Sequence, residues 1–362
     1  MKWNIAGMSK YIKNAIKKMP GISGLVSSRD QLKLALDEAV KQRETLHSET
    51  RALHHGLSQA RAELDEVVRQ RTELLAHRDK LISEARRSQG FVPAGHFYSP
   101  FPCIDEVRND EERIFGEPSR HIAGVALNEE AHLDLLKKFV PYYKEMPFQA
   151  DKQEDLRYYY ENDAFSYSDA ILLHCMIREL QPERIIEVGS GFSSCMTLDT
   201  NELFMDGSID TTFIEPYPEL LMSLLKEQDK NRIKVIPGRL QEVDLNEFEA
   251  LRANDILFID STHVSRIDSD VNRILFDILP GLSSGVYVHF HDIFYPFEYP
   301  KEWVYEGRAW NEAYLLRAFL QNNDAFSIVL MNSYLQHFHK SFLEKNLPLC
   351  LKNTGSIWIR KN

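Results

Sequence analysis

The sequence contains no apolar run that approaches the roughly 18–20 residues of a membrane-spanning helix. Its first residues also lack the continuous apolar stretch of a secretory signal peptide, so we expect a protein that is not exported. The four cysteines are scattered and form no C-x-x-C pair: Cys103, Cys175, Cys195 and Cys350. This spacing shows no zinc-binding pattern and fits a reducing compartment. These absences together predict a cytoplasmic protein.

An excess of positive charge is absent as well. The 43 Lys and Arg residues are outnumbered by 54 Asp and Glu residues, which gives a formal net charge of -11. General nucleic-acid binding needs a basic surface, so we expect no nucleic-acid partner. Hydrophobic residues make up 43% of the 362 positions. That content is enough for one large folded domain or two smaller ones.

Residues 1–27 form a leader that is basic and contains no acidic residue. Its apolar residues recur among the lysines at roughly helical spacing: Trp3, Met8, Tyr11, Ile12, Ile16 and Met19. A basic amphipathic helix of this kind in residues 1–24 could lie on an anionic membrane surface. The alternative is a frayed leader that caps the helix after it.

Residues 28–89 carry a heptad repeat without proline. Its core positions alternate in steps of four and three: Leu32, Leu36, Ala39, Arg43, Leu46, Thr50, Leu53, Leu57, Ala60, Leu64, Val67, Arg71, Leu74, Arg78, Leu81 and Ala85. The polar members occupy only a positions and every d position is aliphatic, which a parallel two-stranded coiled coil tolerates. At about 1.5 Å per residue, the helix would extend on the order of 80 Å. We expect a parallel homodimer, and the alternative is one helix that folds back on the rest of the chain.

Residues 90–168 are expected to form short helices and loops as a cap region. G-F-V-P-A-G (90–95) ends the long helix, and H-F-Y-S-P-F-P (96–102) is too rich in proline for regular structure. A helix is predicted over 128–143. The tyrosines of R-Y-Y-Y-E-N-D-A-F-S-Y (157–167) favour a surface that packs on something. That surface could border a substrate site or form a packing collar where the coil ends.

From residue 169 to 362, helical and strand patterns alternate. Strands are predicted at 184–188, 211–215, 233–236, 255–260, 285–291, 327–331 and 356–360. Helices are predicted at 169–180, 194–204, 218–230, 264–279, 310–321 and, less regularly, 334–345. Alternating strands and helices indicate an α/β domain with a doubly wound sheet and right-handed crossovers.

The segment 184–194, R-I-I-E-V-G-S-G-F-S-S, joins an apolar run to a glycine turn and a helix start. The glycines let backbone amides approach a ligand at the helix N-terminus, as dinucleotides and S-adenosylmethionine require. The dinucleotide fingerprint needs a third glycine where Ser194 stands. Glu187 is costly to bury unless it meets a partner such as a ligand ammonium group, which favours S-adenosylmethionine. We expect the donor to be bound by Glu187, Gly189, Ser190, Gly191 and Ser193.

In such a sheet, ligands bind beyond the carboxyl ends of the strands. The second strand ends in F-I-E-P, with Glu215 and Pro216 roughly twenty residues past the glycines. This spacing suits a carboxylate that accepts hydrogen bonds from both ribose hydroxyls. We therefore assign Glu215 and Pro216 to donor binding as well.

The next strand ends bring acids and histidines together. The fourth ends in D-I-L-F-I-D-S-T-H with Asp260 and His263, and the fifth in V-Y-V-H-F-H-D-I with His289, His291 and Asp292. A histidine could act as general base on an acceptor hydroxyl or amine. Alternatively, Asp260 and Asp292, with His263 or His291, could hold a divalent ion that acidifies that group. One or two of the histidines could instead serve only as partners inside this network. We take Asp260, His263, His291 and Asp292 as the catalytic candidates.

A long aromatic loop follows the fifth strand. It reads F-Y-P-F-E-Y-P-K-E-W (294–303), then G-R-A-W-N-E (307–312), and is placed to cover the site. Arg308 and Asn311 could meet a polar or anionic acceptor, or only begin the next helix.

These motifs resemble the class I S-adenosylmethionine-dependent methyltransferases, most of all a bacterial branch associated with polysaccharide and secondary-metabolite genes. E-V-G-S-G-F-S-S resembles their first motif, with Ser193 where many have a third glycine. F-I-E-P-Y-P resembles the ribose-binding motif, and L-F-I-D-S-T-H and V-H-F-H-D-I-F-Y-P-F-E-Y-P resemble the motifs of the fourth and fifth strands. H-F-Y-S-P and the W-N-E run also look like this branch, so the similarity covers roughly 91–335 and leaves out the coiled coil.

The resemblance implies a Rossmann-like, seven-stranded methyltransferase sheet whose last strand is antiparallel, with catalytic domain 169–362. Similar small-molecule O-methyltransferases bind magnesium through acids at the ends of the fourth and fifth strands. Asp260 and Asp292 match those places, but His291 stands where an acid often does, which leaves the metal open. The family does not imply an acceptor.

Three functions are therefore considered. The first is a methyltransferase that O-methylates a sugar, glycan or related metabolite by in-line transfer, assembled through the coiled coil. The second is a non-catalytic, methyltransferase-like scaffold that assembles a biosynthetic complex. The third, a nicotinamide oxidoreductase, is disfavoured by Ser194.

Overall fold

A computed structural model describes residues 5–19 and 21–362 of the chain. The side chains of 5–7, 17, 22–23 and 84–89 lie outside this description. Backbone packing divides the chain into two units, one that ends at Phe91 and one that begins at Val92. Within the described residues, no helix is both long and apolar enough to cross a membrane.

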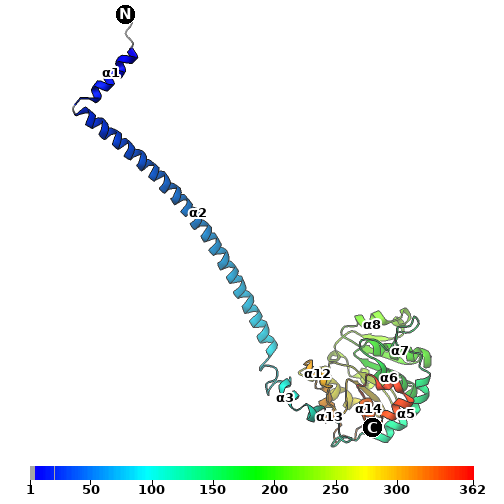
Figure 1. Ribbon diagram of the computed structural model, residues 1–362. Coiled ribbons are helices and arrows are strands. Elements are labelled where there is room, and N and C mark those ends of the chain that lie inside the picture. Colours follow the sequence, from blue (N-terminus) through cyan, green and yellow to red (C-terminus); the bar gives the residue numbers. More distant parts are fainter. Residues whose placement is uncertain (1–4, 20) are drawn as a thin grey trace. The chain divides into compact units, whose positions relative to one another are not determined.

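The first unit is helical (Figure 1). It contains α1 (Ile5–Lys17) and the 68-residue α2 (Ile22–Gln89), which ends at Gly90 in a left-handed conformation with φ 63°. Long helices commonly stop at such a glycine because other residues adopt this conformation at a cost. The predicted break at 90–95 is therefore confirmed.

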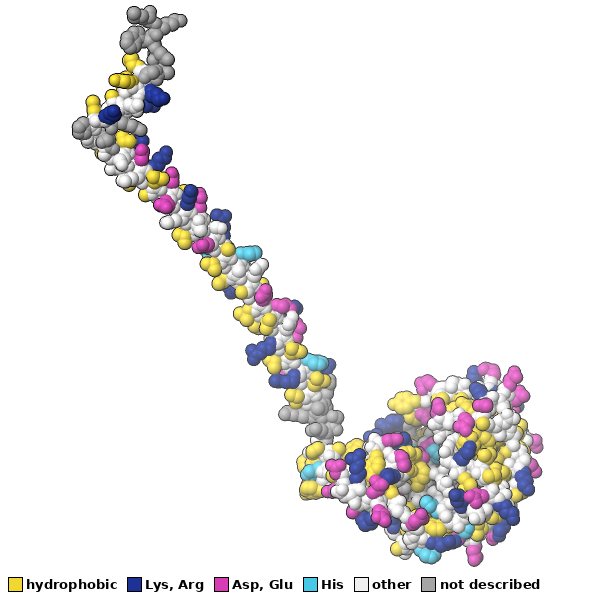
Figure 2. Space-filling model, viewed as in Figure 1, with side chains coloured by type: hydrophobic (Ala, Val, Ile, Leu, Met, Phe, Trp, Pro, Cys, Tyr) yellow, Lys and Arg dark blue, Asp and Glu magenta, His cyan; other side chains and the backbone are white. Residues whose placement is uncertain are grey.

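Hydrophobic side chains recur along the length of α2 and are exposed (Figure 2). The heptad leucines are between 50% and 73% accessible: Leu32, Leu36, Leu46, Leu53, Leu57, Leu64, Leu74 and Leu81. A seam of this kind is buried in coiled coils by a second helix. The structure thus shows the helix, and the coiled coil stays a prediction. The last heptad position, Ala85, lies among the residues whose side chains are not described.

The second unit is built on one seven-stranded sheet with the order β3-β2-β1-β4-β5-β7-β6. Its strands are β1 (Arg184–Val188), β2 (Asp210–Ile214), β3 (Lys234–Ile236), β4 (Ile256–Ile259), β5 (Tyr287–His291), β6 (Phe326–Met331) and β7 (Ser356–Lys361). The first five strands pair in parallel, and β7 runs antiparallel to both β5 and β6. The predicted fold class and its antiparallel last strand are confirmed.

The helices of this unit follow the strands in alternation after a helical cap region. They are α3 (Ile104–Asn109), α4 (Glu111–Phe115), α5 (Glu129–Lys144), α6 (Tyr167–Leu180), α7 (Phe192–Phe204), α8 (Glu219–Leu224), α9 (Asn246–Glu249), α10 (Asp270–Arg273), α11 (Leu279–Gly281), α12 (Lys301–Tyr305), α13 (Glu312–Leu320), α14 (Asn332–Phe338) and α15 (Lys340–Asn346). Short 3-10 turns cover Glu227–Asn231, Leu240–Glu242 and Pro348–Leu351, and a π-helical turn covers Ile274–Ile278.

The helix predicted at 264–279 begins later than expected, at Asp270. Ser269 is its N-cap and accepts a hydrogen bond from the Asn272 amide, which is a strong helix-start signal. His263 and Asp268 before it have positive φ values of 59° and 56°. The residues after β4 therefore form a loop, which leaves them free to line a site.

Helices cover both faces of the sheet, because alternate residues of each strand point to opposite sides. Ile186 and Leu257 pack in one buried cluster with α10, α11 and α13, while Ile185 and Phe258 pack in another with α6 and α7. The result is a three-layer arrangement in which the carboxyl ends of the central strands form one edge of the sheet.

Arg157 joins the cap region to the sheet domain. Its buried guanidinium donates to Asp229 and Glu202 at 2.8 Å each and also pairs with Asp199. Asp199 and Glu202 belong to α7, and Asp229 follows α8. Burying such charges costs several kcal/mol per ion unless they are multiply bonded, so this network orients the tyrosine-rich segment against the helix that starts at the glycine turn.

Candidate active site

The glycine turn lies where β1 and β4 end together. Gly189 has a φ of 80°, and a Cβ there would come within 1.9 Å of the Asp260 carbonyl oxygen. The Asp260 amide in turn donates to the Val188 carbonyl at 2.9 Å. Only glycine fits this approach of two backbones. The turn then passes through Ser190 and Gly191 into α7.

Glu187 lies beneath this turn and is fully buried. Its Oε1 accepts hydrogen bonds from the hydroxyls of Ser193 at 2.5 Å and Ser194 at 2.9 Å. Burial raises the pKa of Glu187 to about 8, although the two serine hydrogen bonds oppose this. Within the described part of the chain, its Oε2 has no partner. The protein itself thus supplies the partner of Glu187, and its contact with a donor stays a prediction.

Glu215 follows β2 and is held by backbone amides. Its Oε2 accepts from the Ser190 amide at 3.1 Å and its Oε1 from the Tyr217 amide at 2.9 Å. The carboxylate therefore bridges the glycine turn and the end of the second strand. This fixed position is what recognition of two adjacent hydroxyls requires.

A pocket of about 620 Å³ opens at these strand ends. Of the predicted donor residues, Gly189, Glu215 and Pro216 line it, and so does Asp260. Glu187, Ser190, Gly191 and Ser193 support the turn without lining the pocket. Sequence reasoning missed part of the wall: Arg239, Leu240 and Gln241 after β3, and Arg266 to Asp270 in the loop after β4. Arg239, Leu240 and Gln241 follow the predicted third strand, and this position at a strand end could have identified them.

At the neighbouring strand ends, two histidines each have a carboxylate behind the imidazole ring, and His263 is the first of them. Its Nδ1 lies 2.8 Å from the Oε2 of the buried Glu312, at the start of α13. Its Nε2 faces the carboxylates of Asp260 at 3.3 Å and Asp292 at 3.5 Å. Glu312 was not among the predicted site residues, although it belongs to the W-N-E run.

His291 is the second of these imidazoles. Its Nδ1 lies 3.4 Å from Asp260 Oδ1 and 3.7 Å from Asp292 Oδ1. Its Nε2 lies 3.6 Å from Oδ2 of Asp169, a buried residue of α6. The four catalytic candidates are thus brought together, and Asp169 and Glu312 complete the cluster.

His289 does not join this cluster. It shares a strand face with His291, as predicted, but its ring stacks on Phe258 at 4.1 Å and lies against Trp358. Burial lowers its pKa well below the ordinary value. Neither ring nitrogen has a partner among the described residues. His289 is therefore a neutral core residue.

The surrounding acids keep the two site histidines charged. Burial alone would lower the pKa of His263, but its contacts with Asp260 and Glu312 outweigh burial and raise the pKa to about 10. The pKa of His291 is likewise raised by Asp260 and Asp292 against the effect of burial. A base role for either imidazole would therefore need another cation to compensate the acids.

The cluster also fits a metal ion. Single atoms of Asp260, His291 and Asp292 lie within 4.8 Å of one another. The Nδ1 atom of His291 is buried and makes no hydrogen bond within the described part of the chain. An imidazole nitrogen without a hydrogen-bond partner and the two carboxylates beside it are ligand types that a divalent cation can bind.

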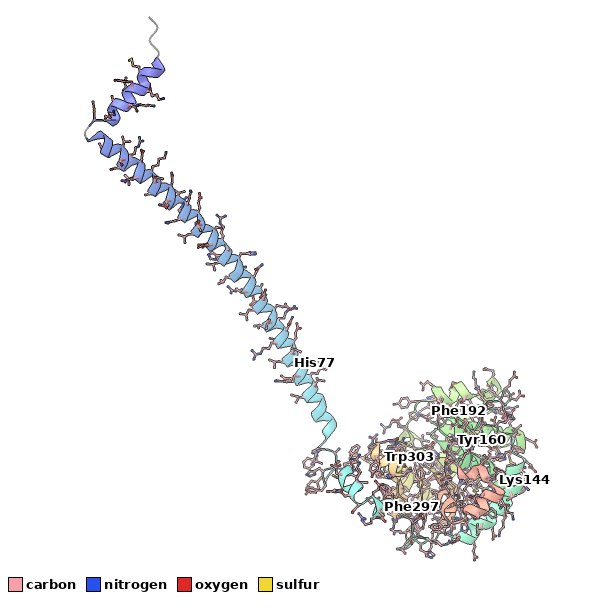
Figure 3. All side chains as sticks on the ribbon, viewed as in Figure 1. His77, Lys144, Tyr160, Phe192, Phe297 and Trp303 are labelled. Atoms are coloured by element: carbon pink, nitrogen blue, oxygen red, sulfur yellow. The ribbon has the colours of Figure 1, made fainter. Side chains whose placement is uncertain are left out.

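The aromatic loop lies against the cluster, as expected. Trp310 packs on His263 with ring centroids 4.4 Å apart, and Trp303 of α12 packs on Trp310. Figure 3 labels Trp303 in the sheet-containing unit. Arg308 stacks on Trp303 at 4.4 Å and pairs with Glu306. Asn311 bonds the backbone of Ser265, so it holds the loop in place.

Comparisons with known proteins agree with this geometry. Residues 186–293 match a family model described as a methyltransferase domain. A protein of Archaeoglobus fulgidus, named only as uncharacterized, is 37% identical over 169 residues, which is 45% of this chain and 75% of that protein. The chain therefore carries a methyltransferase domain.

Solved structures show weaker likeness to this methyltransferase. The SAH-bound methyltransferase PaMTH1 of Podospora anserina is 16% identical, with a TM-score of 0.37 over 72% of this chain and 95% of that one. The O-methyltransferase TomG of Streptomyces achromogenes is 15% identical, with a TM-score of 0.36 over 66% of this chain and 91% of that one. At these scores neither contributes to the assignment, which rests on the sequence matches.

The buried Glu187 predicts how the stability of the methyltransferase depends on pH. From pH 4.5 to about 8, the folded state retains a proton that the unfolded state releases. The free energy of unfolding should therefore fall as pH rises through this window, by on the order of a few kcal/mol. Glu187→Gln should flatten this slope in urea titrations at several pH values. Glu183→Gln, at an exposed position, should leave the slope unchanged, and an unaltered slope in Glu187→Gln would refute a protonated Glu187.

Proposed function

We propose that this methyltransferase O-methylates a hydroxyl of a sugar, glycan or related small metabolite. The main observation behind this proposal is the position of Asp260. This residue lines the pocket proposed for the donor and also contacts His263 and His291. With a donor bound in the pocket, the Asp260 side chain would therefore lie between its methyl group and the rest of the acid–histidine cluster. The acceptor class rests on the resemblance of the sequence motifs.

In the proposed reaction, S-adenosylmethionine supplies an activated methyl group for in-line displacement. The chain has to align donor and acceptor and accept one proton. Glu215, fixed by two backbone amides, would bind the ribose hydroxyls. One carboxylate of the cluster, Asp260 or Asp292, would receive the acceptor proton, because the two histidines already carry protons. A divalent ion held by Asp260 and Asp292 would acidify the acceptor hydroxyl.

Aromatic side chains lie next to the acid–histidine cluster. Trp310 packs on His263 and Trp303 packs on Trp310, while Arg308 stacks on both indole rings and pairs with Glu306. Apolar walls with a few polar groups are typical of small-molecule sites. The alternative of a non-catalytic scaffold has less support, because the chain offers both a pocket at the glycine turn and carboxylates that can accept a proton.

We further propose the domain division of a leader (1–27), a coiled coil (28–89), a cap region (90–168) and a catalytic domain (169–362). The end of α2 at Gln89 supports the second boundary. The exposed leucine seam of α2 supports a parallel homodimer in the cytoplasm. The leader could contact the inner membrane face, with residues 1–4 and 20 outside the described part of the chain.

A pair of variants tests donor binding apart from transfer. Glu215→Ala should weaken S-adenosylmethionine binding at least tenfold in calorimetry, because charge-assisted hydrogen bonds are lost. Asp292→Asn, outside the pocket wall, should keep donor affinity and lose transfer of labelled methyl to a panel of saccharides. Glu219→Ala, an exposed neighbour, is the control. Unchanged binding in Glu215→Ala would contradict the donor site, and transfer unchanged in Asp292→Asn would contradict the role of the cluster.

The coiled-coil proposal predicts a dimer that one seam charge disrupts. Leu53→Glu places a carboxylate at a d position, where two copies would face each other in an apolar seam. Light scattering should give a dimer mass for the unaltered chain and mostly monomer for this variant. Ser58→Glu adds the same charge at an outward position and should remain dimeric. A monomer mass for the unaltered chain would refute the proposal.

The leader predicts binding to anionic vesicles. Met8, Ile12 and Ile16 are exposed on one side of α1, and Lys10 and Lys13 lie on the other. The chain should co-sediment with mixed phosphatidylcholine–phosphatidylglycerol vesicles, less so at high salt. Ile12→Asp should abolish this binding, whereas Asn14→Asp, with the same added charge on the polar side, should retain part of it. If both variants lost vesicle binding equally, the charge of the helix alone, and not its apolar side, would explain the binding to the vesicles.

A further inference from the structure

The metal-fitting cluster differs from an all-oxygen site in containing an imidazole. Asp260 follows β4, and His291 and Asp292 are adjacent at the end of β5. Consecutive strand residues normally point to opposite faces. Asp292 has a φ of 57°, a left-handed conformation that costs about 1 kcal/mol or more outside glycine. This backbone turn lets both side chains reach one point, together with Asp260.

The spacing of these atoms suits ligands of a shared ion. His291 Nδ1 lies 3.4 Å and 3.7 Å from the nearest oxygens of Asp260 and Asp292. These distances exceed the range of about 2.7–3.2 Å for N–H···O hydrogen bonds. Two ligands that are each about 2.1 Å from one ion in tetrahedral geometry lie about 3.4 Å apart. The gap between the three side chains is therefore about the size of a small divalent cation.

Asp169 lies beside the Nε2 atom of His291, while the Nδ1 atom faces this gap. Its Oδ1 accepts from the Asn332 amide group at 2.5 Å, which leaves Oδ2 facing His291 Nε2 at 3.6 Å. A cation that binds Nδ1 would displace the proton there, and the remaining Nε2 proton would face Asp169, as in the carboxylate–histidine–metal arrangements of metalloproteins.

We infer that Asp260, His291 and Asp292 bind a transition-metal ion such as Mn²⁺ or Co²⁺ in preference to Mg²⁺, with His291 as a ligand through Nδ1 and Asp169 as its positioning residue. Mg²⁺ takes oxygen ligands almost exclusively, whereas imidazole suits the first-row transition metals. One imidazole with two carboxylates therefore shifts the preference away from Mg²⁺. The inference deepens the proposed function, since it names the ion beside the acceptor.

Metal binding can be measured without any acceptor. Mn²⁺ should bind the metal-free chain at least tenfold more tightly than Mg²⁺, by electron paramagnetic resonance of free Mn²⁺ and competition with Mg²⁺. Co²⁺ should give visible absorption bands that change when His291 is replaced. His291→Asp should restore an all-oxygen site and bring the Mn²⁺-to-Mg²⁺ ratio towards one. His121→Asn, an exposed histidine of the same unit, should keep the original ratio.

Asp169→Asn tests the positioning role. It should lower Mn²⁺ affinity 10- to 100-fold, the usual effect of losing such a partner, with His291 still present. Thermal unfolding without metal and S-adenosylmethionine calorimetry on the same variants separate this result from misfolding and from failure of the donor site. A chain that binds donor but binds Mn²⁺ no better than Mg²⁺, or whose preference survives His291→Asp, would overturn the inference.

Discussion

The side-by-side alignment of β1 and β4 at their carboxyl ends is the constraint on which the site depends. The Asp260 amide bonds the Val188 carbonyl, and the Asp260 carbonyl lies so close to Gly189 that no side chain fits there. This contact places the glycine turn, where Gly189 lines the pocket at the strand ends, directly beside the first acid of the cluster. The pocket and the acid–histidine cluster are neighbours because two backbones meet.

Charge compensation is the second organising feature. Asp169, Asp260, Asp292 and Glu312 surround two imidazoles, and each imidazole has an acid behind it and two in front. Buried acids in such number are stable only with cations among them. The protein meets this need with protonated histidines, and a divalent ion would meet it differently and release an imidazole for other work. A divalent ion bound in this cluster would therefore compete with those protons.

Much of this architecture could be predicted along the chain. The seven strands were located within one or two residues, because buried parallel strands are continuous apolar runs with clear ends. Asp260, His291 and Asp292 stood at those ends and do meet, and Glu215 lines the same pocket as Asp260. Asp169 and Glu312 were missed because they start helices far away in sequence, where an acid is ordinarily explained by the helix dipole. His289 was left out of the catalytic candidates, and it does lie in the core, although it shares a strand face with His291.

The sequence by itself determined the sheet, the glycine turn and the chemical types at each strand end, since these follow from local periodicity and backbone limits. Only the tertiary structure decided which groups touch: that Glu187 is bonded by Ser193 and Ser194, that Asp169 backs His291, and that Asp292 turns towards Asp260. Those contacts depend on helices that pack from distant segments and on one left-handed residue. Neither leaves a periodic signal in the chain.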